Sequence, residues 1–342
     1  MTTPILSGQN PQAIMQAAQA LKQGQLVALP TETVYGLGAD ADQDHACKAI
    51  YTAKGRPAGH PLIVHVSSPA AAQHYAQSIP ECAQKLIHTF WPGPLTIIVK
   101  RLPGVAQTAA GGHDTIGLRC PSHPVAQSLL HTFESIGGHG IAAPSANRFG
   151  RLSPTTAAHV AQTFDELEHS PLALILDGGP SEVGIESTII DCSRDYPVLL
   201  RPGILTQAQI EKATGMPLLI KPTASEDNPK APGTLKAHYA PKAKVRLMDA
   251  QNLKVAVGML SSVNASNQTR IGVYARDLPQ TKAKHIIARK MPANAKTVAH
   301  ELFAVLHDFD AQGVSLLWVE TPPDEPEWLG VRDRLERAAA SG

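Results

Sequence analysis

Cationic and imidazole side chains gather in the segment KGRPAGHPLIVHV, residues 54–66. Lys54 and Arg56 come first, His60 follows, and His65 lies within an apolar run that should form a buried strand. The segment contains no Asp or Glu to neutralise this charge. A cation near a helix C-terminus commonly does no more than complement the helix dipole. Cations gathered at one place can also bind a phosphate or a carboxylate through charge-assisted hydrogen bonds.

Hydroxyl, amide and guanidinium side chains also lie in predicted loops at strand ends, where α/β proteins usually bind ligands. The first such loop is PTETVYGLGAD, residues 30–40. Taken singly, each residue is explained by a turn, a helix cap or a surface ion pair. Taken together, they predict one cavity rich in hydrogen-bond donors, which a polyphosphate and a carboxylate need. The residues concerned are the threonines of residues 30–40 together with Arg119, Ser145, Asn147, Ser153, Thr155, Ser187, Thr188 and Arg201.

Several other chemistries lack their sequence signatures. The 15 histidines show no H-E-x-x-H or comparable spacing, and neither a G-x-x-x-x-G-K-[ST] loop nor a G-x-S-x-G elbow occurs. The four cysteines lie far apart without C-x-x-C spacing, so we expect buried, reduced thiols. Asp40, Asp177 and Asp191 are candidate metal ligands, but turn or cap roles explain them better.

Hydrophobic periodicity predicts the elements that must position these residues. One helix is capped by Asn10 and ended by Gly24, a second spans about 44–54, and a third opens with a capping box from Ser78 to Glu81. Short apolar runs predict strands that are too many and too close for strictly alternating βαβ units. We therefore predict an α/β (α+β) fold with a twisted mixed sheet. The strands are expected at 25–30, 61–66, 95–100, 115–120, 141–146, 172–177, 187–191 and 197–202.

At 342 residues the chain exceeds the usual size of a single core, so two domains are expected. Near Gly215 a proline-rich stretch without periodicity begins. We predict a large domain over 1–215, an ordered linker over 216–243 and a small Rossmann-like α/β domain over 244–342, without a G-x-G-x-x-G fingerprint. The strands of the small domain are expected at 244–248, 254–260, 270–275, 285–289 and 315–320, and its helices around Val298–Phe309 and Trp328–Ala338.

Composition limits the classes of partner. Lys plus Arg number 30 against 29 Asp plus Glu, so no global basic field indicates nucleic acid or an anionic membrane. The first residues lack the basic and apolar regions of a signal peptide, and no stretch approaches the roughly 20 apolar residues of a membrane span. We expect a cytoplasmic protein without a membrane partner.

With these residues in view, the chain resembles the threonylcarbamoyl-AMP synthases, in the two-domain form of the YrdC-like family. The matching segments occur in family order and reach from the first predicted loop through the linker. Any one of them is a weak signal, whereas their common order is specific. They are LPTETVYGLGAD, KGRPAGHPLIVHV, WPGPLTII, GLRCPSHP, APSAN, LSPT, ESTIID, LRPG and PGTLKAHYAP.

The resemblance implies that L-threonine, bicarbonate and ATP react to give threonylcarbamoyl-AMP and pyrophosphate, with Mg²⁺ bound mainly through the ATP phosphates. A tRNA-modifying transferase complex would then transfer the threonylcarbamoyl group to an adenosine of tRNA. Lys54 and Arg56 are the implied catalytic cations. By similarity, the L-threonine pocket comprises Thr33, His65, Arg119, Ser145 and Ser187. The ATP site comprises Lys54, Arg56, His60, Thr115, Asn147, Thr155, Arg201 and Tyr239.

This chemistry accounts for the gathered cations. A carbamate and a triphosphate repel each other unless fixed positive charges offset that repulsion in a low-dielectric site. An aligned carbamate is already nucleophilic and needs little help from a general base. The match at HYAP further implies that the linker contributes to the active site, with Tyr239 folded over the nucleotide to exclude water.

Two other functions stay open. One is a non-catalytic RNA-binding module, which near-neutral charge and an aromatic content of 4% disfavour. The other is a carbamoyl-adenylate former that uses carbamoyl phosphate, whose relatives in hydrogenase maturation normally carry additional fused modules. The C-terminal domain is expected either to hold the linker in place or to dock tRNA, through a weak contact, or the transferase. The sequence does not indicate the oligomeric state.

Overall fold

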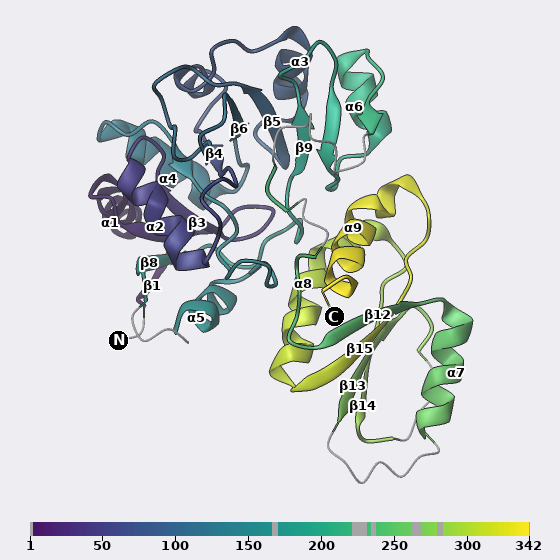
Figure 1. Cartoon of the computed structure of the whole chain (residues 1–342). Coiled ribbons are helices and arrows are strands. Elements are labelled where there is room, and N and C mark those ends of the chain that lie inside the picture. The colour runs from purple at the N-terminus through teal and green to yellow at the C-terminus, as the bar shows by residue number, and fades with distance from the viewer. Residues whose placement is uncertain are drawn as a thin grey trace. The chain divides into compact units, whose positions relative to one another are not determined.

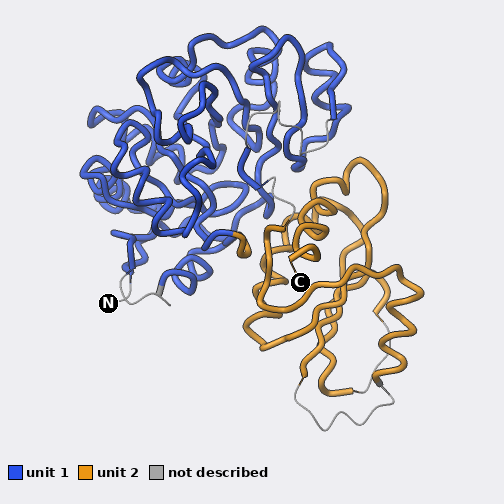
Figure 2. Tube along the Cα trace, in the orientation of Figure 1, with its two compact units in different colours: residues 1–149, 153–234 blue, residues 150–152, 235–342 orange. Residues whose placement is uncertain are grey.

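The chain forms two compact units, drawn in different colours in Figure 2. The first comprises residues 1–149 and 153–234, and the second comprises 150–152 and 235–342. The computed structural model describes residues 3–165, 170–220, 231–233, 237–261, 269–278 and 283–341.

The predicted linker over 216–243 stays a prediction, because residues 221–230 and 234–236 lie outside the described residues. Among the helices that the structure describes, none is long and apolar enough to cross a membrane.

The described strands of the first unit form one mixed sheet, as predicted, in the order β1-β8-β2-β3-β7-β4-β6-β5-β9-β10-β11 (Figure 1). The strands are β1 (Ile5–Ser7), β2 (Leu26–Leu29), β3 (Gly36–Asp40), β4 (Ile63–His65), β5 (Leu95–Lys100), β6 (Thr115–Arg119), β7 (Ile141–Ala142), β8 (Leu172–Asp177), β9 (Thr188–Asp191), β10 (Val198–Arg201) and β11 (Leu219–Ile220). The helices are α1 (Pro11–Lys22), α2 (Asp44–Lys54), α3 (Glu81–Phe90), α4 (Pro124–Ser135), α5 (Ala157–Asp165), α6 (Gln207–Thr214) and the 3-10 helix η1 (Ala71–His74).

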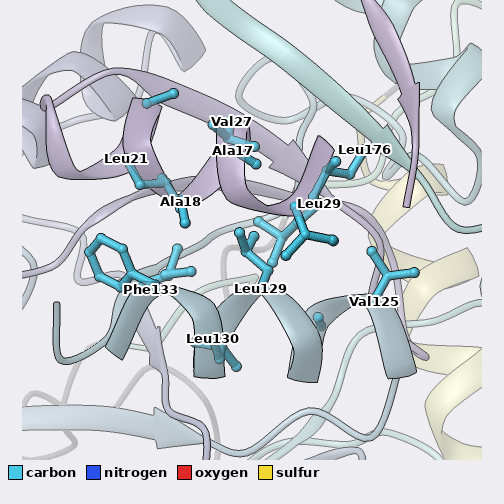
Figure 3. Close-up of a cluster of buried hydrophobic side chains, with 14 of the residues drawn as sticks. Ala17, Ala18, Leu21, Val27, Leu29, Val125, Leu129, Leu130, Phe133 and Leu176 are labelled. Carbon is cyan, nitrogen blue, oxygen red and sulfur yellow. The ribbon is translucent and has the colours of Figure 1, made fainter. Parts of the chain in front are cut away.

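The helix predicted at Asn10 is α1, and local capping explains its start. The Asn10 side chain accepts a hydrogen bond from Gln12 N (3.0 Å), and a proline occupies the first helical position. The buried face of α1 packs with α4, β2 and β8 in one apolar cluster, which holds the sheet from one side (Figure 3). Its labelled members are Ala17, Ala18, Leu21, Val27, Leu29, Val125, Leu129, Leu130, Phe133 and Leu176.

Strand β3 lies within residues 30–40, which the sequence analysis assigns to a loop. Glycine has a low strand propensity, and this hides the strand in the sequence. The close pairing with β2 nevertheless requires glycine. A Cβ atom on Gly38 would lie 2.8 Å from Leu29 Cδ2 and 3.0 Å from Val27 O. The loop prediction is therefore wrong for the second half of this stretch.

The predicted capping box from Ser78 to Glu81 is wrong. The N-cap of α3 is Pro80, which makes no side-chain cap hydrogen bond. Glu81 is the first helical residue, so its carboxylate cannot reach back as a capping box requires. It instead pairs with Lys85 Nζ one turn later, at 2.8 Å.

In the second unit, four described strands form a parallel sheet in the order β12-β15-β13-β14 (Figure 1). Together with its helices, this sheet makes the small α/β domain that the sequence predicts. The strands are β12 (Lys244–Met248), β13 (Arg270–Ala275), β14 (Ile286–Lys290) and β15 (Val314–Glu320). The helices are α7 (Ala250–Ser261), α8 (Ala295–Ala311), α9 (Leu329–Ala339) and the 3-10 helix η2 (Pro326–Trp328).

The strand predicted over 254–260 is wrong, because this stretch lies in α7. Asp249 Oδ1 accepts a hydrogen bond from Asn252 N (2.8 Å) and so caps the start of a helix. Leu253 and Val257, four residues apart, are both buried. The helical period of the apolar residues therefore outweighs the strand propensity of the valines.

Candidate active site

Strand ends of the first unit bring several predicted site residues to one edge of the sheet. β4 and β6 run parallel, and their register sets His65 opposite Arg119. β5 and β9 also run parallel, so Ser187, one residue before β9, lies at the end of the sheet where β6 stops. β10 is antiparallel to β9, so its last residue, Arg201, lies near the start of β9 and close to Ser187. The topology thus gathers residues that are far apart in sequence.

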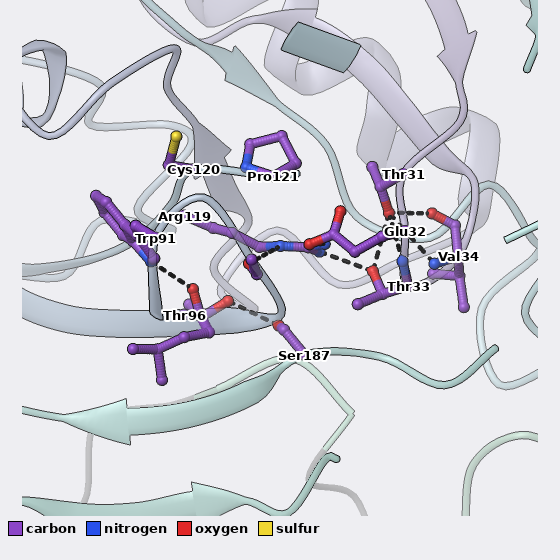
Figure 4. Close-up of polar contacts among 12 residues, drawn as sticks. Thr31, Glu32, Thr33, Val34, Trp91, Thr96, Arg119, Cys120, Pro121 and Ser187 are labelled. Atoms are coloured by element: carbon purple, nitrogen blue, oxygen red, sulfur yellow. Dashed lines mark hydrogen bonds and ion pairs between the residues drawn. The ribbon is translucent and has the colours of Figure 1, made fainter. Parts of the chain in front are cut away.

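The Arg119 guanidinium is the centre of the first cluster, and it points toward the turn that precedes β3 (Figure 4). Its Nη1 donates to Thr33 Oγ1 (2.8 Å), and its Nε donates to Gly93 O at 3.4 Å. Its Nη2 lies 2.8 Å from Glu32 Oε1 in an ion pair whose side chains are only 5% and 4% exposed. We call Glu32, Thr33 and Arg119 the Arg119 cluster.

Glu32 is the residue of this cluster that the sequence analysis missed. Both of its carboxylate oxygens are buried and lack a hydrogen-bond donor among the described residues. The Arg119 contact is an ion pair without hydrogen-bond geometry. A buried carboxylate normally has its hydrogen bonds satisfied, so these oxygens can accept from a ligand. The sequence did contain a signal for this role, because Glu32 directly precedes Thr33 within residues 30–40.

Ser187 and Arg201 form a neighbouring pair of donors. Ser187 Oγ lies 2.7 Å from Thr96 Oγ1 (Figure 4). Arg201 Nη2 donates to Ser187 O (2.9 Å) and to Ser187 Oγ (3.1 Å), and its Nη1 donates to Pro232 O (3.0 Å). The Arg201 side chain is thereby locked in place. A guanidinium held in this way costs little conformational entropy when a ligand binds.

Lys54 is the centre of a second cluster. It is the last residue of α2, which ends because Gly55 adopts the left-handed conformation (φ 62°). Lys54 Nζ donates to Ser145 O (2.6 Å) and Asn147 O, and Phe149 N donates to Lys54 O (2.8 Å). We call Lys54, Ser145 and Asn147 the Lys54 cluster.

The Lys54 pKa lies well below its usual value, first because burial penalises the ammonium and then because Arg56 adds positive charge nearby. Its two hydrogen-bond acceptors are neutral backbone carbonyls. An anionic ligand beside Nζ would therefore favour the charged form.

The Lys54 cluster is joined to β3 by backbone contacts. Ser145 forms an isolated antiparallel bridge with Gly36. On either side of it, Leu37 N donates to Pro144 O (2.7 Å) and Ala146 N donates to Tyr35 O (2.8 Å). The segment that carries Thr33 thus leads directly to the loop that holds the Lys54 cluster.

Arg56 and His60 lie beside this cluster. Arg56 Nη2 donates to Pro61 O (3.0 Å), and its guanidinium lies 5.8 Å from the centroid of the Phe149 ring. The His60 ring meets the same ring edge-on, with the centroids 5.8 Å apart. Phe149 N is bonded to Lys54 O, so Arg56 and Lys54 share one support.

His65 is buried and uncharged. Burial, and then the positive charge of Arg119, lower its pKa from 6.5 to about 3. At neutral pH its imidazole is therefore a neutral group with one donor and one acceptor nitrogen.

The remaining predicted residues lie in different surroundings. Thr115, the first residue of β6, lines a small pocket together with Ile63, Ile98, Ile189 and Pro232. The pocket is small, since its volume of about 10 Å³ is no more than one water molecule needs. Thr155 is buried, and its Oγ1 lies 3.4 Å from His159 Nδ1.

Tyr239 belongs to the second unit and is described with it. Its backbone has a positive φ of 61°, and its side chain is buried. The Arg334 guanidinium lies 5.3 Å from the ring centroid, and the Phe303 ring lies 5.6 Å away. Its role over a nucleotide stays a prediction.

The three aspartates considered as metal ligands act as turn caps. Each accepts a hydrogen bond from a backbone N–H two residues further on: Asp40 from residue 42, Asp177 from residue 179 and Asp191 from residue 193, at 3.1, 2.9 and 2.9 Å. The expectation that Mg²⁺ is held mainly by phosphate oxygens is compatible with these contacts.

Two family descriptions match consecutive parts of the chain. The Sua5–YciO–YrdC family, described as "Telomere recombination", matches residues 19–203. The description "Threonylcarbamoyl-AMP synthase, C-terminal domain" matches residues 205–340.

Relatives resemble the chain over nearly its whole length. The threonylcarbamoyl-AMP synthase of Bacillus subtilis is 38% identical over 98% of this chain and 95% of the relative, and that of Pyrococcus abyssi is 38% identical over 94% and 93%.

Solved structures of P. abyssi Sua5 have the same fold. A complex with L-threonine is 36% identical, with a TM-score of 0.85 over 97% of this chain and 95% of that one. A variant with alanine in place of an adjacent histidine and tyrosine is 35% identical, with a TM-score of 0.87 over 99% and 97%. The chain therefore belongs to the two-domain Sua5/YrdC family of threonylcarbamoyl-AMP synthases and is an enzyme of the nucleotidyltransferase type.

Proposed function

We propose that the enzyme forms threonylcarbamoyl-AMP and pyrophosphate from L-threonine, bicarbonate and ATP, as the supply of the threonylcarbamoyl group for tRNA modification. The Arg119 cluster carries the proposal. It offers a guanidinium and a carboxylate with open oxygens side by side, and these are the two charges that an amino-acid zwitterion needs. The P. abyssi Sua5 complex with L-threonine supports the choice of amino acid.

Within this pocket, we assign the threonine carboxylate to Arg119 and the ammonium to Glu32. The Thr33 hydroxyl accepts from Arg119 and donates to Thr31 Oγ1 (2.9 Å), whose own proton goes to Val34 O, so Thr33 would meet the substrate through its remaining lone pair. His65, Ser145 and Ser187 complete the proposed pocket as neutral partners for the carboxylate and the side-chain hydroxyl. Glu32 is also placed to take a proton from the ammonium, because only the neutral amine can attack carbon dioxide.

The ATP site is proposed around the Lys54 cluster. Lys54 and Arg56 are the catalytic cations, and Arg201 adds a third positive charge. Asn147, Thr155 and His60 would contact phosphate or ribose, Thr115 joins the proposed nucleotide contacts by resemblance to the family, and Tyr239 would cover the nucleotide. In the reaction, bicarbonate takes up a proton and loses water to give carbon dioxide, and the threonine nitrogen bonds to its carbon and releases a proton. A carbamate oxygen then bonds to the α-phosphorus and displaces pyrophosphate.

Mg²⁺ would lower the charge repulsion at the triphosphate and would be held mainly by its phosphate oxygens. The chain's own contribution is the set of fixed cations, which position the carbamate against the α-phosphate. The Lys54 ammonium is held by two carbonyls, and an arriving anion would stabilise it, since burial and Arg56 lower its pKa before the ligand binds.

The test is mass spectrometry of the products from ATP, L-threonine and ¹³C-bicarbonate, with pyrophosphate release measured in parallel. We expect a threonylcarbamoyl-adenylate one mass unit heavier than the unlabelled product, and its loss in Lys54→Ala and Arg56→Ala. Pyrophosphate release that depends on carbamoyl phosphate rather than threonine would overturn the proposal. RNA retention on a filter without any pyrophosphate release would overturn it as well.

A further inference from the structure

Two histidines and an aspartate converge on one point of the first unit, apart from the candidate active site. His74 Nε2 lies 3.1 Å from Asp42 Oδ2, and His139 Nδ1 lies 2.9 Å from the same oxygen. One nitrogen of each ring and one carboxylate oxygen lie within 4.8 Å of one another. Three separate segments supply them: the turn after β3, the end of η1 and the turn before β7. We call these residues the Asp42 triad.

The strand register builds two sides of the triad. β3 and β7 are antiparallel, with Asp40 opposite Ile141. The ladder continues past the strand ends, because Ala41 N donates to Gly140 O (3.0 Å). The next pair in this register is Asp42 and His139, so the fold itself sets their side chains against each other.

The third side comes from η1. His74 stacks on His139 with the ring centroids 3.8 Å apart and the planes 7° from parallel. The neighbouring Tyr75 hydroxyl lies 3.5 Å from Asp42 Oδ2, on the buried side of the carboxylate. Two imidazole nitrogens and a phenol oxygen therefore lie within 3.5 Å of the same carboxylate oxygen, Asp42 Oδ2.

We propose that the Asp42 triad binds a divalent transition-metal ion of the Zn²⁺ class. Two imidazole nitrogens and one carboxylate oxygen are a ligand set that suits Zn²⁺, Co²⁺ and Ni²⁺ and does not suit Mg²⁺. Tetrahedral bonds of about 2.0–2.1 Å set ligand atoms about 3.3 Å apart. The nitrogen–oxygen separations of 3.1 and 2.9 Å are close to that spacing.

The stacked rings must tilt when the ion binds, because a metal bonds in the plane of an imidazole ring. The side chains have room to do so, since His74 is 33% exposed and His139 is 53% exposed. The same exposure gives the ion a path from solvent and leaves space for water as a fourth ligand. Each histidine moves its proton to the other ring nitrogen, so neutral imidazoles need not lose a net proton.

The bound ion would act on stability rather than on chemistry. The triad lies at one end of β3, whereas Thr33 and the Gly36–Ser145 bridge lie at the other. Asp42 lies six positions after Gly36, which is at most roughly 20 Å of extended chain. The ion would tie η1 to the open end of the β3–β7 ladder and so raise the unfolding temperature without contacting the substrates.

The test is titration of the purified, chelator-treated full chain with Co²⁺ and Zn²⁺. Co²⁺ reports a tetrahedral site through visible d–d absorption, and Zn²⁺ should displace it. We expect one site of micromolar affinity and an unfolding temperature that rises with Zn²⁺ concentration. His139→Ala and Asp42→Asn should each weaken binding at least tenfold, and Asp42→Asn keeps the shape of the side chain.

His131→Asn is the matched control, because His131 is an exposed histidine 3.7 Å from a carboxylate, that of Glu134, but outside the triad. It should bind Co²⁺ as the parent does. Equal binding by the parent and both triad variants would show adventitious binding elsewhere and overturn the proposal, as would no binding by the folded parent. A parent that binds Zn²⁺ but fails to make threonylcarbamoyl-AMP would contradict only the proposed function.

Discussion

The two cationic clusters of the first unit hold their charges in different ways. In the Arg119 cluster, a permanently charged guanidinium faces a buried carboxylate, so the site is nearly neutral before any ligand arrives. In the Lys54 cluster, the ammonium donates to two backbone carbonyls, and burial and then the charge of Arg56 lower its pKa, although the Glu186 carboxylate acts in the opposite direction. The difference teaches that the first cluster offers both charges that a zwitterion needs, whereas burial disfavours the charged form of the second, so an arriving anion would stabilise that form.

The largest effect is expected from Lys54→Ala. In the proposed mechanism the ammonium meets the charge that develops on the phosphates, so its loss should lower pyrophosphate release roughly 100- to 1,000-fold. Steady-state kcat and KM for ATP measure this loss. Lys48→Ala is the matched control, since Lys48 lies on the same helix but is exposed, and it should keep parent rates. A Lys54→Ala enzyme with parent kcat would remove the Lys54 cluster from the mechanism.

Glu32→Gln tests the Arg119 cluster directly. The variant keeps the volume but loses the negative charge, so we expect KM for L-threonine to rise on the order of 10- to 100-fold, with a smaller change for ATP. It also leaves the Arg119 charge buried without its partner, which should destabilise the fold by about 3–5 kcal/mol. Urea unfolding and threonine titrations measure both effects. An unchanged threonine KM in a folded variant would show that Glu32 serves Arg119 alone.

His65 should make the first unit sensitive to acid. Its pKa is about 3 in the folded chain against an ordinary 6.5, so between these values the unfolded chain binds a proton that the folded chain does not. Stability should therefore fall as pH decreases from 6.5 toward 3, by up to about 1.4 kcal/mol per pH unit from this group. The difference between the parent and His65→Gln, measured by urea unfolding across this range, isolates the contribution. If the free energies of unfolding of the parent and of His65→Gln changed equally with pH, His65 would not be held neutral in the folded chain.

The smallest effect is expected from Thr96→Val. This change removes one hydrogen bond to Ser187 while nearly keeping the shape, so stability should fall by about 1 kcal/mol. The Ser187 hydroxyl still receives Arg201 Nη2, and the threonine KM should rise only a few-fold. Denaturant unfolding and threonine titration check this. A rise in the threonine KM as large as that expected for Glu32→Gln would place Thr96 in the proposed L-threonine pocket itself.

Sequence reasoning succeeded where the signals are local. The apolar period predicts the helix over 44–54, and the structure shows that Gly55 ends it in the left-handed conformation. Arg119 was singled out because it ends an apolar strand, and it does end β6. In both cases neighbouring residues carry the information.

It failed where distant residues decide. From the sequence, Glu32 is an ordinary acidic residue in a loop. Its burial depends on the ion pair with Arg119, which lies 87 residues further along the sequence. β3 reads as a loop because Gly38 is required by its neighbour β2 and not by its own propensity. The Asp42 triad likewise depends on the pairing of β3 with β7, which no single segment encodes.

The backbone bridge between Gly36 and Ser145 has a further consequence. It joins the segment that carries Glu32 and Thr33 to the loop whose carbonyls bind Lys54. The backbone hydrogen bonds on either side of the bridge measure 2.7 and 2.8 Å. The spacing between the proposed L-threonine pocket and the proposed ATP site is then a fixed property of the folded backbone. The binding of either substrate therefore need not supply the free energy for ordering the other site. Substitutions that disrupt this backbone contact should weaken the affinities for L-threonine and for ATP together.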